Sequence, residues 1–365
     1  MINTVKIIGS GLIGTSIGLA LKTNSKAGTT QVLMQDTDLE AQKLAQSLVD
    51  PAADDSINSF DLVVVAVPIS ENITTVSKNL KENPKSIVVD LASVKSNLLN
   101  EVEGLSENRQ NFVSLHPMAG REVSGAHSAR ADLFVNRAWI GIAPAYSSAK
   151  AKEMATEFVQ MCGGTLYWRT IKEHDEIVAL VSHVPQILSS AMAIALVDRT
   201  AEDLLLSGSG LTDMTRLAAS DSQLWTQILQ ENSSFVNAKL ETLIKTLMQF
   251  QAALALNKTD EIKKLLETAK IGRQKIPGKH GAKPRNYLNL NIVIKDEPGQ
   301  LAKIIDLCAK NRINIEDISI EHSPGQATGL VTISILDLAD SARNETLNLF
   351  KSNGWDIYLD FVKER

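Results

Sequence analysis

The fold of the N-terminal part of the chain is decided by the stretch Val5-Lys6-Ile7-Ile8-Gly9-Ser10-Gly11-Leu12-Ile13-Gly14. Its first four residues predict a strand, and residues 17–21 continue as a helix. Between the two, Gly9 permits a tight turn, Gly11 lets a ligand approach the backbone, and Gly14 lets the helix pack on the strand. Unpaired N–H groups at the start of such a helix attract phosphate groups. We therefore predict that this turn, with Leu12 and Ile13, binds the pyrophosphate of a dinucleotide; a glycine turn of another α/β protein is the alternative.

The kind of dinucleotide depends on an acidic residue at the end of the next predicted strand. The apolar run 31–35 ends at Asp36, 22 positions after Gly14. A carboxylate at this point accepts hydrogen bonds from the adenosine ribose and repels a 2′-phosphate. The sequence thus predicts NAD as the cofactor rather than NADP.

Further apolar runs predict that this part of the chain is an α/β domain. The runs at 62–67, 87–91, 112–115 and 139–143 lack alternation, as expected of strands covered on both faces, and helical segments separate most of them. This pattern indicates a doubly wound parallel sheet, in which the carboxyl ends of the strands meet at one ligand-binding edge. The segments expected at that edge are the glycine turn, Asp36, Val67-Pro68, Ala92-Ser93-Val94-Lys95 and His116-Pro117-Met118-Ala119-Gly120. Among them we expect Val67, Pro68 and Ser93 to contact the cofactor.

Composition narrows the class of protein. A chain of 365 residues is long enough for two or three domains, and its net charge of −5 argues against a nucleic-acid partner. Its two cysteines, Cys162 and Cys308, lie far apart and predict neither a disulfide nor a metal site, which suits a reducing compartment. We find neither a signal peptide nor an apolar run of bilayer length, and therefore expect a cytoplasmic protein without a membrane partner.

The pattern of the chain changes twice after the α/β domain. Residues 171–271 show helical periodicity, with a break near 232–233, and an apolar stripe that suggests a homodimer built through these helices. Residues 272–285 are rich in glycine, proline and basic side chains, which indicates a linker. Residues 286–365 follow the order β-α-β-β-α-β of a ferredoxin-like module. The predicted domains are therefore 1–170, 171–271 and 286–365, joined by the linker 272–285.

His116 is the candidate for proton transfer. Because Pro117 follows it, its backbone is extended, and it stands at the mouth of a strand over the expected nicotinamide. A neutral imidazole there can accept the proton of a substrate hydroxyl while the attached carbon gives up a hydride. A buried His116 would contradict this role, and a local turn hydrogen bond is the alternative. Ser93 is placed to hydrogen-bond both His116 and the nicotinamide, or to cap the next helix.

A second polar cluster lies in the helical section. His174-Asp175 is followed by Ser182-His183-Val184-Pro185-Gln186, and Asp175 and His183 lie eight residues apart on one helix face. The two need an intervening group or a kink in order to touch, and their spacing does not suit a metal site. Arg216 has a guanidinium suited to a substrate carboxylate, although a structural salt bridge explains it equally well.

Together these motifs resemble the prephenate dehydrogenase family over residues 1–270. The resemblance is carried by the glycine turn, Asp90-Leu91-Ala92-Ser93-Val94-Lys95, His116-Pro117-Met118-Ala119-Gly120-Arg121-Glu122, His174-Asp175, Ser182-His183-Val184-Pro185 and Thr215-Arg216-Leu217-Ala218. It implies that prephenate and NAD give 4-hydroxyphenylpyruvate, CO2 and NADH, with His116 as base and Ser93 orienting it. It also implies substrate contacts from Arg216, His183 and Asp175. Some relatives carry a second histidine where this chain has Gln186, so recognition of the substrate side chain can differ.

The last eighty residues resemble an ACT domain. Asp296-Glu297-Pro298-Gly299-Gln300-Leu301 matches its first turn, and Asn314-Ile315 matches the start of its second strand. The resemblance implies an amino-acid effector, L-tyrosine, bound near Asp296, Gly299 and Asn314. The alternative is a module that only dimerises.

Three other functions remain to be weighed against this reading. Arogenate dehydrogenase is the nearest. A β-hydroxyacid dehydrogenase would place a catalytic lysine with a nearby asparagine in the long helix, a pattern not found around Lys239 or Lys245. A non-catalytic sensor of NAD and an amino acid would bind the cofactor without producing NADH.

Overall fold

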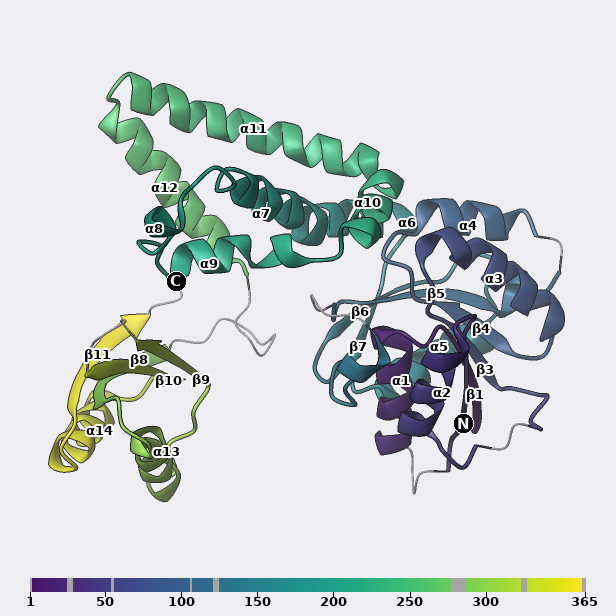
Figure 1. The fold of residues 1–365 in the computed structure, drawn as a ribbon, viewed down its shortest axis with the longest axis horizontal. Coiled ribbons are helices and arrows are strands. Elements are labelled where there is room, and N and C mark those ends of the chain that lie inside the picture. Colours follow the sequence, from purple (N-terminus) through teal and green to yellow (C-terminus); the bar gives the residue numbers. More distant parts are fainter. Residues whose placement is uncertain are drawn as a thin grey trace. The chain divides into compact units, whose positions relative to one another are not determined.

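The computed structural model describes residues 2–24, 29–53, 56–105, 107–120, 125–276, 287–322 and 327–362. The chain forms two compact units, Met1–Gln249 and Phe250–Arg365 (Figure 1). Each unit is described by itself.

A seven-stranded sheet forms the centre of the first unit, with the order β2-β1-β3-β4-β5-β6-β7. Its first five strands are parallel, as predicted. The prediction is wrong for the run at 139–143, because β6 is antiparallel to β5. A parallel neighbour needs a long crossover, usually an α-helix, whereas the described part of the connection between them contains turns and the three-residue 3-10 helix Ala126–Ser128. The strands are β1 (Thr4–Ile8), β2 (Gln31–Gln35), β3 (Leu62–Val65), β4 (Ile87–Asp90), β5 (Phe112–Pro117), β6 (Ala138–Ile142) and β7 (Thr165–Trp168).

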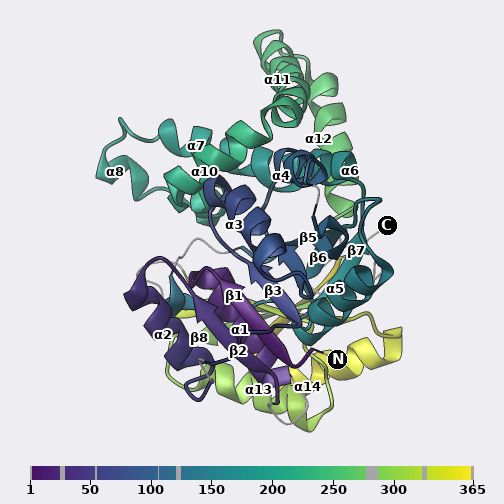
Figure 2. The ribbon, with the colours of Figure 1, turned by 90° about the vertical axis from the view of Figure 1, so that its right-hand side faces the viewer.

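Helices cover both faces of this sheet (Figures 1 and 2). The helices α1 (Leu12–Asn24), α2 (Leu39–Val49) and α5 (Ala149–Met161) bury their apolar residues in one core. On the other face, α3 (Ile69–Glu82) and α4 (Ser96–Glu103) bury theirs in a second core. Every residue of β3, β4 and β5 is buried, which explains why their sequences do not alternate.

This strand order positions the site. The strand β1 lies between β2 and β3. The connection after β1 leads to one side of it and the connection after β2 crosses to the other side, which opens a crevice at the carboxyl end of β1. Because β1 to β5 are parallel, the segments that follow all five of them gather at that edge of the sheet.

The rest of the first unit is helical. The break predicted near 232–233 is found, since α10 ends at Glu231 and α11 begins at Ser233. A small core of Ala179, Val184 and Val236 holds these helices together. The elements are α6 (Ile171–Val178), the π-helical turn η4 (Ala179–His183), α7 (Val184–Ile194), α8 (Ala201–Leu204), α9 (Ser209–Thr215), η5 (Arg216–Ala219), α10 (Ser222–Glu231) and α11 (Ser233–Ala255), whose last residues belong to the second unit.

One helical run is long and apolar enough to contradict the prediction that no segment reaches bilayer length. Residues Ile171–Ile194 form 24 consecutive helical residues, and an 18-residue window within them has a mean hydropathy of 1.7, which satisfies the length and composition of a membrane span. The same test is met by core helices, and this run carries the buried His174, Asp175 and His183, which bond to other parts of the unit. These bonds make the run part of the first unit.

The second unit contains α12 (Thr259–Gln274) and a four-stranded antiparallel sheet of order β11-β8-β10-β9. Its elements follow the predicted order: β8 (Tyr287–Lys295), α13 (Gln300–Lys310), β9 (Asp317–His322), β10 (Thr328–Leu336), α14 (Asp340–Ser352) and β11 (Asp356–Val362). Most of the predicted linker 272–285 lies outside the described residues, and its first three residues belong to α12.

Candidate active site

The glycine turn after β1 has the geometry that its sequence predicts. Gly9 has a φ of +104°, and a Cβ there would lie 2.2 Å from the Ala66 carbonyl oxygen. A Cβ on Gly14 would lie 2.0 Å from the Gly9 oxygen, so only glycine lets α1 begin this close to β1. At Gly11, which is exposed, a Cβ would meet nothing within 4 Å. The open space lies at the middle glycine, where a pyrophosphate needs access to the backbone.

Asp36 closes the other side of this turn. One carboxylate oxygen accepts the backbone N–H of Ser10 at 2.6 Å, and the other accepts that of Asp38 at 3.0 Å. The hydroxyl of Thr37 also donates to Oδ1, at 3.5 Å, so Oδ2 is the oxygen that keeps a lone pair for a ribose hydroxyl. The residues present therefore fit a dinucleotide with an unmodified ribose. Of the other predicted cofactor residues, Leu12 is buried, Ile13 and Val67 are half-buried, and Pro68 is exposed at the start of α3.

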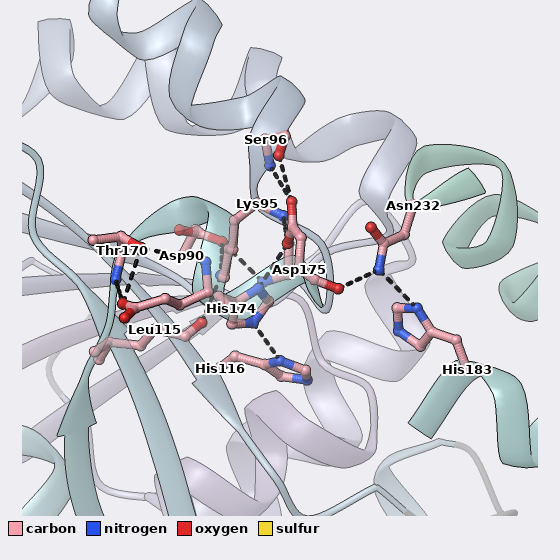
Figure 3. Close-up of polar contacts among 12 residues, drawn as sticks. Asp90, Lys95, Ser96, Leu115, His116, Thr170, His174, Asp175, His183 and Asn232 are labelled. Atoms are coloured by element: carbon pink, nitrogen blue, oxygen red, sulfur yellow. Dashed lines mark hydrogen bonds and ion pairs between the residues drawn. The ribbon is translucent and has the colours of Figure 1, made fainter. Parts of the chain in front are cut away.

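At the end of β5, His116 is joined to the helical part of the unit through a second histidine. His116 Nδ1 lies 2.9 Å from His174 Nε2, and His174 Nδ1 lies 2.7 Å from Asp175 Oδ1 (Figure 3). Among the described residues, no hydrogen bond reaches His116 Nε2. His116 is buried, with 9% of its surface exposed, because the ring of His174 packs beside it. This burial counts against the accessible base that the sequence predicts.

Asp175 is not placed to bind a substrate, contrary to the prediction. Its Oδ1 accepts from His174 Nδ1 and from the backbone N–H of Lys95, while its Oδ2 accepts from the N–H and hydroxyl of Ser96. These four bonds fill the acceptor capacity of a carboxylate, and only 1% of the residue is exposed. The N–H groups belong to the start of α4, so Asp175 caps a helix that lies 80 residues earlier in the chain.

This capping keeps Asp175 charged. Burial by itself raises the pKa of the Asp175 carboxyl, but the hydrogen bonds from His174, Ser96 and the backbone of Lys95 outweigh it. The pKa therefore lies below its ordinary value. Asp175 is a carboxylate at neutral pH.

A fully buried ion pair supports the strand that carries His116. Lys95 Nζ lies 2.8 Å from Asp90 Oδ2 and donates to the Leu115 carbonyl oxygen at 2.7 Å. Leu115 directly precedes His116, so the ammonium group joins the end of β4 to the end of β5. Burial lowers the pKa of Lys95, and the charge of Asp90 opposes this. The sequence pattern assigns no role to Lys95; the available signal is a lysine five residues after Asp90, the last residue of an apolar strand.

The three histidines of this region are held neutral. Burial, followed by the influence of His174, Lys95 and His183, places the pKa of His116 well below its ordinary value. Burial also lowers the pKa of His174, against the opposing effect of Asp175, and lowers that of His183 to about 4. His116 is therefore an unprotonated base at neutral pH.

Ser93 does not have the contact to His116 that was predicted. It is half-buried after β4, and no hydrogen bond among the described residues joins it to His116, whose Nδ1 is engaged by His174. Nor does it cap α4, whose N-cap residue is Lys95. Its position at the strand end leaves it a cofactor-contact candidate.

The intervening group and the kink expected between Asp175 and His183 are both present. Asn232 Nδ2 donates to the Asp175 backbone carbonyl at 2.9 Å and lies 3.1 Å from His183 Nδ1. The π-helical turn η4 changes the phase of the helix between them. His183 is 1% exposed and meets the Trp225 ring edge-on, so it is part of the packing between α7 and α10.

Gln186 and Arg216 belong to one small assembly. Gln186 Nε2 donates to the Leu217 carbonyl at 2.8 Å, and Ser189 Oγ accepts the N–H of Ala218 at 3.1 Å. These bonds fasten η5, which begins with the exposed Arg216, to α7. Gln186 Oε1 is buried and has no hydrogen-bond partner among the described residues.

The predicted effector residues lie in two loops of the second unit: Asp296 and Gly299 between β8 and α13, and Asn314 between α13 and β9. Gly299 has a φ of +89° and precedes α13, while the backbone N–H of Asp296 donates to the Ala327 carbonyl. Asn314 is exposed and donates to Glu316 Oε1 at 2.7 Å.

Comparisons with known proteins agree with this geometry. Residues 17–168 match the family model for the nucleotide-binding domain of prephenate dehydrogenase, and residues 170–268 match the one for its dimerization domain. The chain is 31% identical to a probable prephenate dehydrogenase of Streptomyces niveus, over 91% of this chain and 94% of that protein. It is 26% identical to prephenate dehydrogenase of Bacillus subtilis, over 94% and 95% of the two chains.

A solved structure shows the same fold. Prephenate dehydrogenase from Aquifex aeolicus, in complex with hydroxyphenyl propionate and NAD+, has a TM-score of 0.68 and 26% identity. The alignment covers 76% of this chain and 99% of that one. The chain belongs to the prephenate dehydrogenase family and is an NAD-dependent, oxidatively decarboxylating dehydrogenase.

Proposed function

We propose that the protein oxidises prephenate to 4-hydroxyphenylpyruvate and CO2, with reduction of NAD, as a step of tyrosine biosynthesis. The observation that carries the proposal is the neutral His116, whose Nε2 is the ring nitrogen without a partner among the described residues. Bound NAD supplies the hydride acceptor. His116 Nε2 takes the proton of the substrate hydroxyl, and the loss of CO2 completes the aromatic ring.

The remaining residues align the reactants in this proposal. The turn from Gly9 to Gly14 and Asp36 hold the dinucleotide, with Val67, Pro68 and Ser93 beside it at the strand ends. Arg216 binds one of the two substrate carboxylates. His183 supports the pocket from the helical side, whereas Asp175 acts only through its bonds to His174 and α4.

The direct test is NADH absorbance on mixing the purified protein with prephenate and NAD. We expect turnover, and we expect Asp36→Ser to weaken the preference for NAD over NADP. Asp38→Ser is the matched control, because Asp38 caps α2. NAD binding without NADH formation would overturn the proposal and favour the sensor.

Arogenate is the second candidate substrate, and Gln186 favours it. A buried carbonyl oxygen without a partner is costly, and an ammonium group on the ligand would satisfy it. Prephenate carries no such donor at its side chain, whereas arogenate does. Comparing kcat/KM for the two substrates decides between them. If Gln186→Leu lowers both values equally, this residue does not discriminate.

We also propose that the protein is a homodimer formed through the helical region. In support, residues 170–268 match a dimerization domain, and several large apolar side chains there are well exposed. They include Leu180, Val181, Ile194, Val197, Leu205 and Leu206. Sedimentation at micromolar concentration should give a dimer, and Ile194→Asp should shift it towards monomer.

For the second unit we propose an ACT-type regulatory module that binds L-tyrosine near Asp296, Gly299 and Asn314. The ferredoxin-like strand order and the left-handed Gly299 before α13 support this. L-tyrosine should inhibit turnover, and Asn314→Ala should weaken the inhibition without changing the uninhibited rate. Inhibition that survives loss of Asn314 would place the effector elsewhere.

Two further proposals concern the chain as a whole. We propose the division 1–170, 171–271, 272–285 and 286–365; the two matching family models, over 17–168 and 170–268, support its first boundary. We also propose a cytoplasmic location, which the two free, buried cysteines suit. Limited proteolysis and cell fractionation test these two proposals.

A further inference from the structure

We propose that His174 and Asp175 are positioning residues that determine which nitrogen of His116 is the base. The inference rests on the proposed function and deepens it. It depends on a continuous chain of hydrogen bonds, His116–His174–Asp175, that ends on a carboxylate whose acceptor sites are all used (Figure 3). His174 and Asp175 are adjacent in sequence, but His116 lies 58 residues before His174, so the sequence spacing does not predict the bond between the two histidines.

This chain of hydrogen bonds has a direction because the carboxylate of Asp175 can only accept hydrogen bonds. Two backbone N–H groups at the start of α4 and the hydroxyl of Ser96 all donate to its carboxylate. A proton on either oxygen would oppose one of these donors. His174 must therefore present Nδ1–H to Asp175 Oδ1, at 2.7 Å.

The tautomer of His174 then determines that of His116. With its proton on Nδ1, neutral His174 carries a lone pair on Nε2. This lone pair faces His116 Nδ1 at 2.9 Å, so His116 must donate from Nδ1. The lone pair of neutral His116 is left on Nε2, the nitrogen that no described residue engages. A histidine locked in the opposite tautomer would offer the substrate an N–H instead of a base.

Burial keeps both rings neutral in the resting protein. His174, Lys95 and His183 also lower the pKa of His116. Lys95 lowers the pKa of His174 as well, whereas Asp175 and Asp90 raise it without offsetting the burial. Burial disfavours the imidazolium form of both rings. Two neutral imidazoles in series require one donor and one acceptor on each ring, as the tautomers above provide.

The same hydrogen bonds stabilise His116 after it has taken up the proton of the substrate hydroxyl. As the O–H bond of the substrate breaks, its proton forms a bond to His116 Nε2, and the ring becomes an imidazolium. His116 Nδ1–H stays directed at His174 Nε2, and the carboxylate of Asp175 offsets the new positive charge from beyond His174. His174 and Asp175 touch neither substrate nor cofactor in this account; they orient and stabilise the base.

The decisive measurement is the tautomer of His116 in the full-length protein. Selective 15N labelling of histidine, with the His116 signals identified by their loss in His116→Gln, reports which ring nitrogen carries the proton. We expect Nδ1 to be protonated and Nε2 unprotonated near pH 7.5, with and without NAD. A proton on Nε2 of the neutral ring would overturn the inference.

Variants provide the second test. His174→Phe keeps a flat ring but removes the acceptor, and we expect kcat to fall roughly 10- to 100-fold with the KM for NAD little changed. His174→Gln retains an acceptor oxygen and should recover part of the loss. His127→Phe, which replaces an exposed histidine, is the matched control.

The outcomes separate the two proposals. Normal turnover and an unchanged His116 tautomer in a folded His174→Phe protein would refute the positioning role and leave the proposed function intact. Should His174→Phe fail to fold, the tautomer of the wild-type protein still decides. Absence of turnover in the wild type with either substrate would refute the proposed function, whereas the tautomer measurement needs no substrate.

Discussion

The two sheets of the molecule bury their strands in different ways. In the first unit, β3, β4 and β5 are buried along their whole length, because helices cover both faces. In the second unit, β8 and β10 alternate between buried and half-buried residues, because the core packs against one face only.

This difference decides where polar groups can lie. On the second sheet they stand along the strands and pair across them, as Thr332 does with Asn291 and Ser334 with Asn289, each at 2.8 Å. In the buried strands β3, β4 and β5 of the first sheet, the titratable groups lie at the strand ends, where Asp90 and His116 join groups from other segments. We therefore expect substitutions of polar residues in the first sheet to affect the active site, and those in the second sheet to have only local effects.

The largest contrast is expected for catalysis. His116→Gln removes the proposed base, and kcat should fall about 100- to 10,000-fold while NAD affinity stays nearly unchanged. Steady-state rates and NAD titration measure the two quantities. Asn291→Ala, on the second sheet, should leave the rate as it is. Near-normal turnover of His116→Gln would remove this residue from the mechanism.

The next contrast concerns stability. Lys95→Met leaves the buried carboxylate of Asp90 without its partner, which should destabilise the first unit by about 3–5 kcal/mol. Urea unfolding measures this loss, and adding Asp90→Asn should restore part of it. Lys239→Met breaks a solvent-exposed pair with Glu176 and should cost far less, because water and salt screen such a pair. Equal losses for the two lysines would show that burial of the pair is unimportant.

The pH dependence sharpens the comparison further. Because burial lowers the pKa of His116, its basic form persists below the ordinary histidine range. The acid limb of kcat/KM should therefore lie below pH 6.5, with about a tenfold loss per unit beyond it. An acid limb centred above pH 6.5 would mean that the ring is less desolvated than its 9% exposure suggests.

The lowered pKa values of the three histidines also predict how the free energy of unfolding depends on pH. His116, His174 and His183 have lowered pKa values in the folded chain, so the unfolded chain binds more protons below about pH 6.5. Their contribution to stability is present above that pH and is lost as the pH falls towards about 4, the pKa of His183. Urea unfolding at pH 7, 6 and 5 should show a declining free energy of unfolding.

The smallest expected effect lies in the second unit. Gly354 follows α14 with a φ of +89°, and a Cβ there would meet nothing within 4 Å. Gly354→Ala should therefore cost only the backbone strain, about 1 kcal/mol, and leave turnover unchanged. Thermal unfolding of the variant checks this value. A loss above about 3 kcal/mol would indicate a contact that the geometry does not include.

Several features could be predicted because short-range rules govern them. The glycine turn, Asp36 at the end of β2 and the gathering of five strand ends follow from local sterics, chain direction and strand periodicity. The direction of β6 could not be predicted, since a buried apolar run reads the same in either orientation. The roles of Ser93 and Asp175 were misjudged for a related reason: spacing identifies polar groups near a site but does not show which lone pairs are already used.

By itself, the amino-acid sequence determined the dinucleotide turn, the preference for an unmodified ribose and the candidate base, because each depends on residues close together in the chain or on a regular repeat. Only the tertiary structure decided that His174 rather than Ser93 holds His116, that Asp175 caps α4, and that Lys95 reaches the Leu115 carbonyl. Hydrogen bonds have direction and limited number, so a group's partners are settled only when distant segments pack together and compete for them.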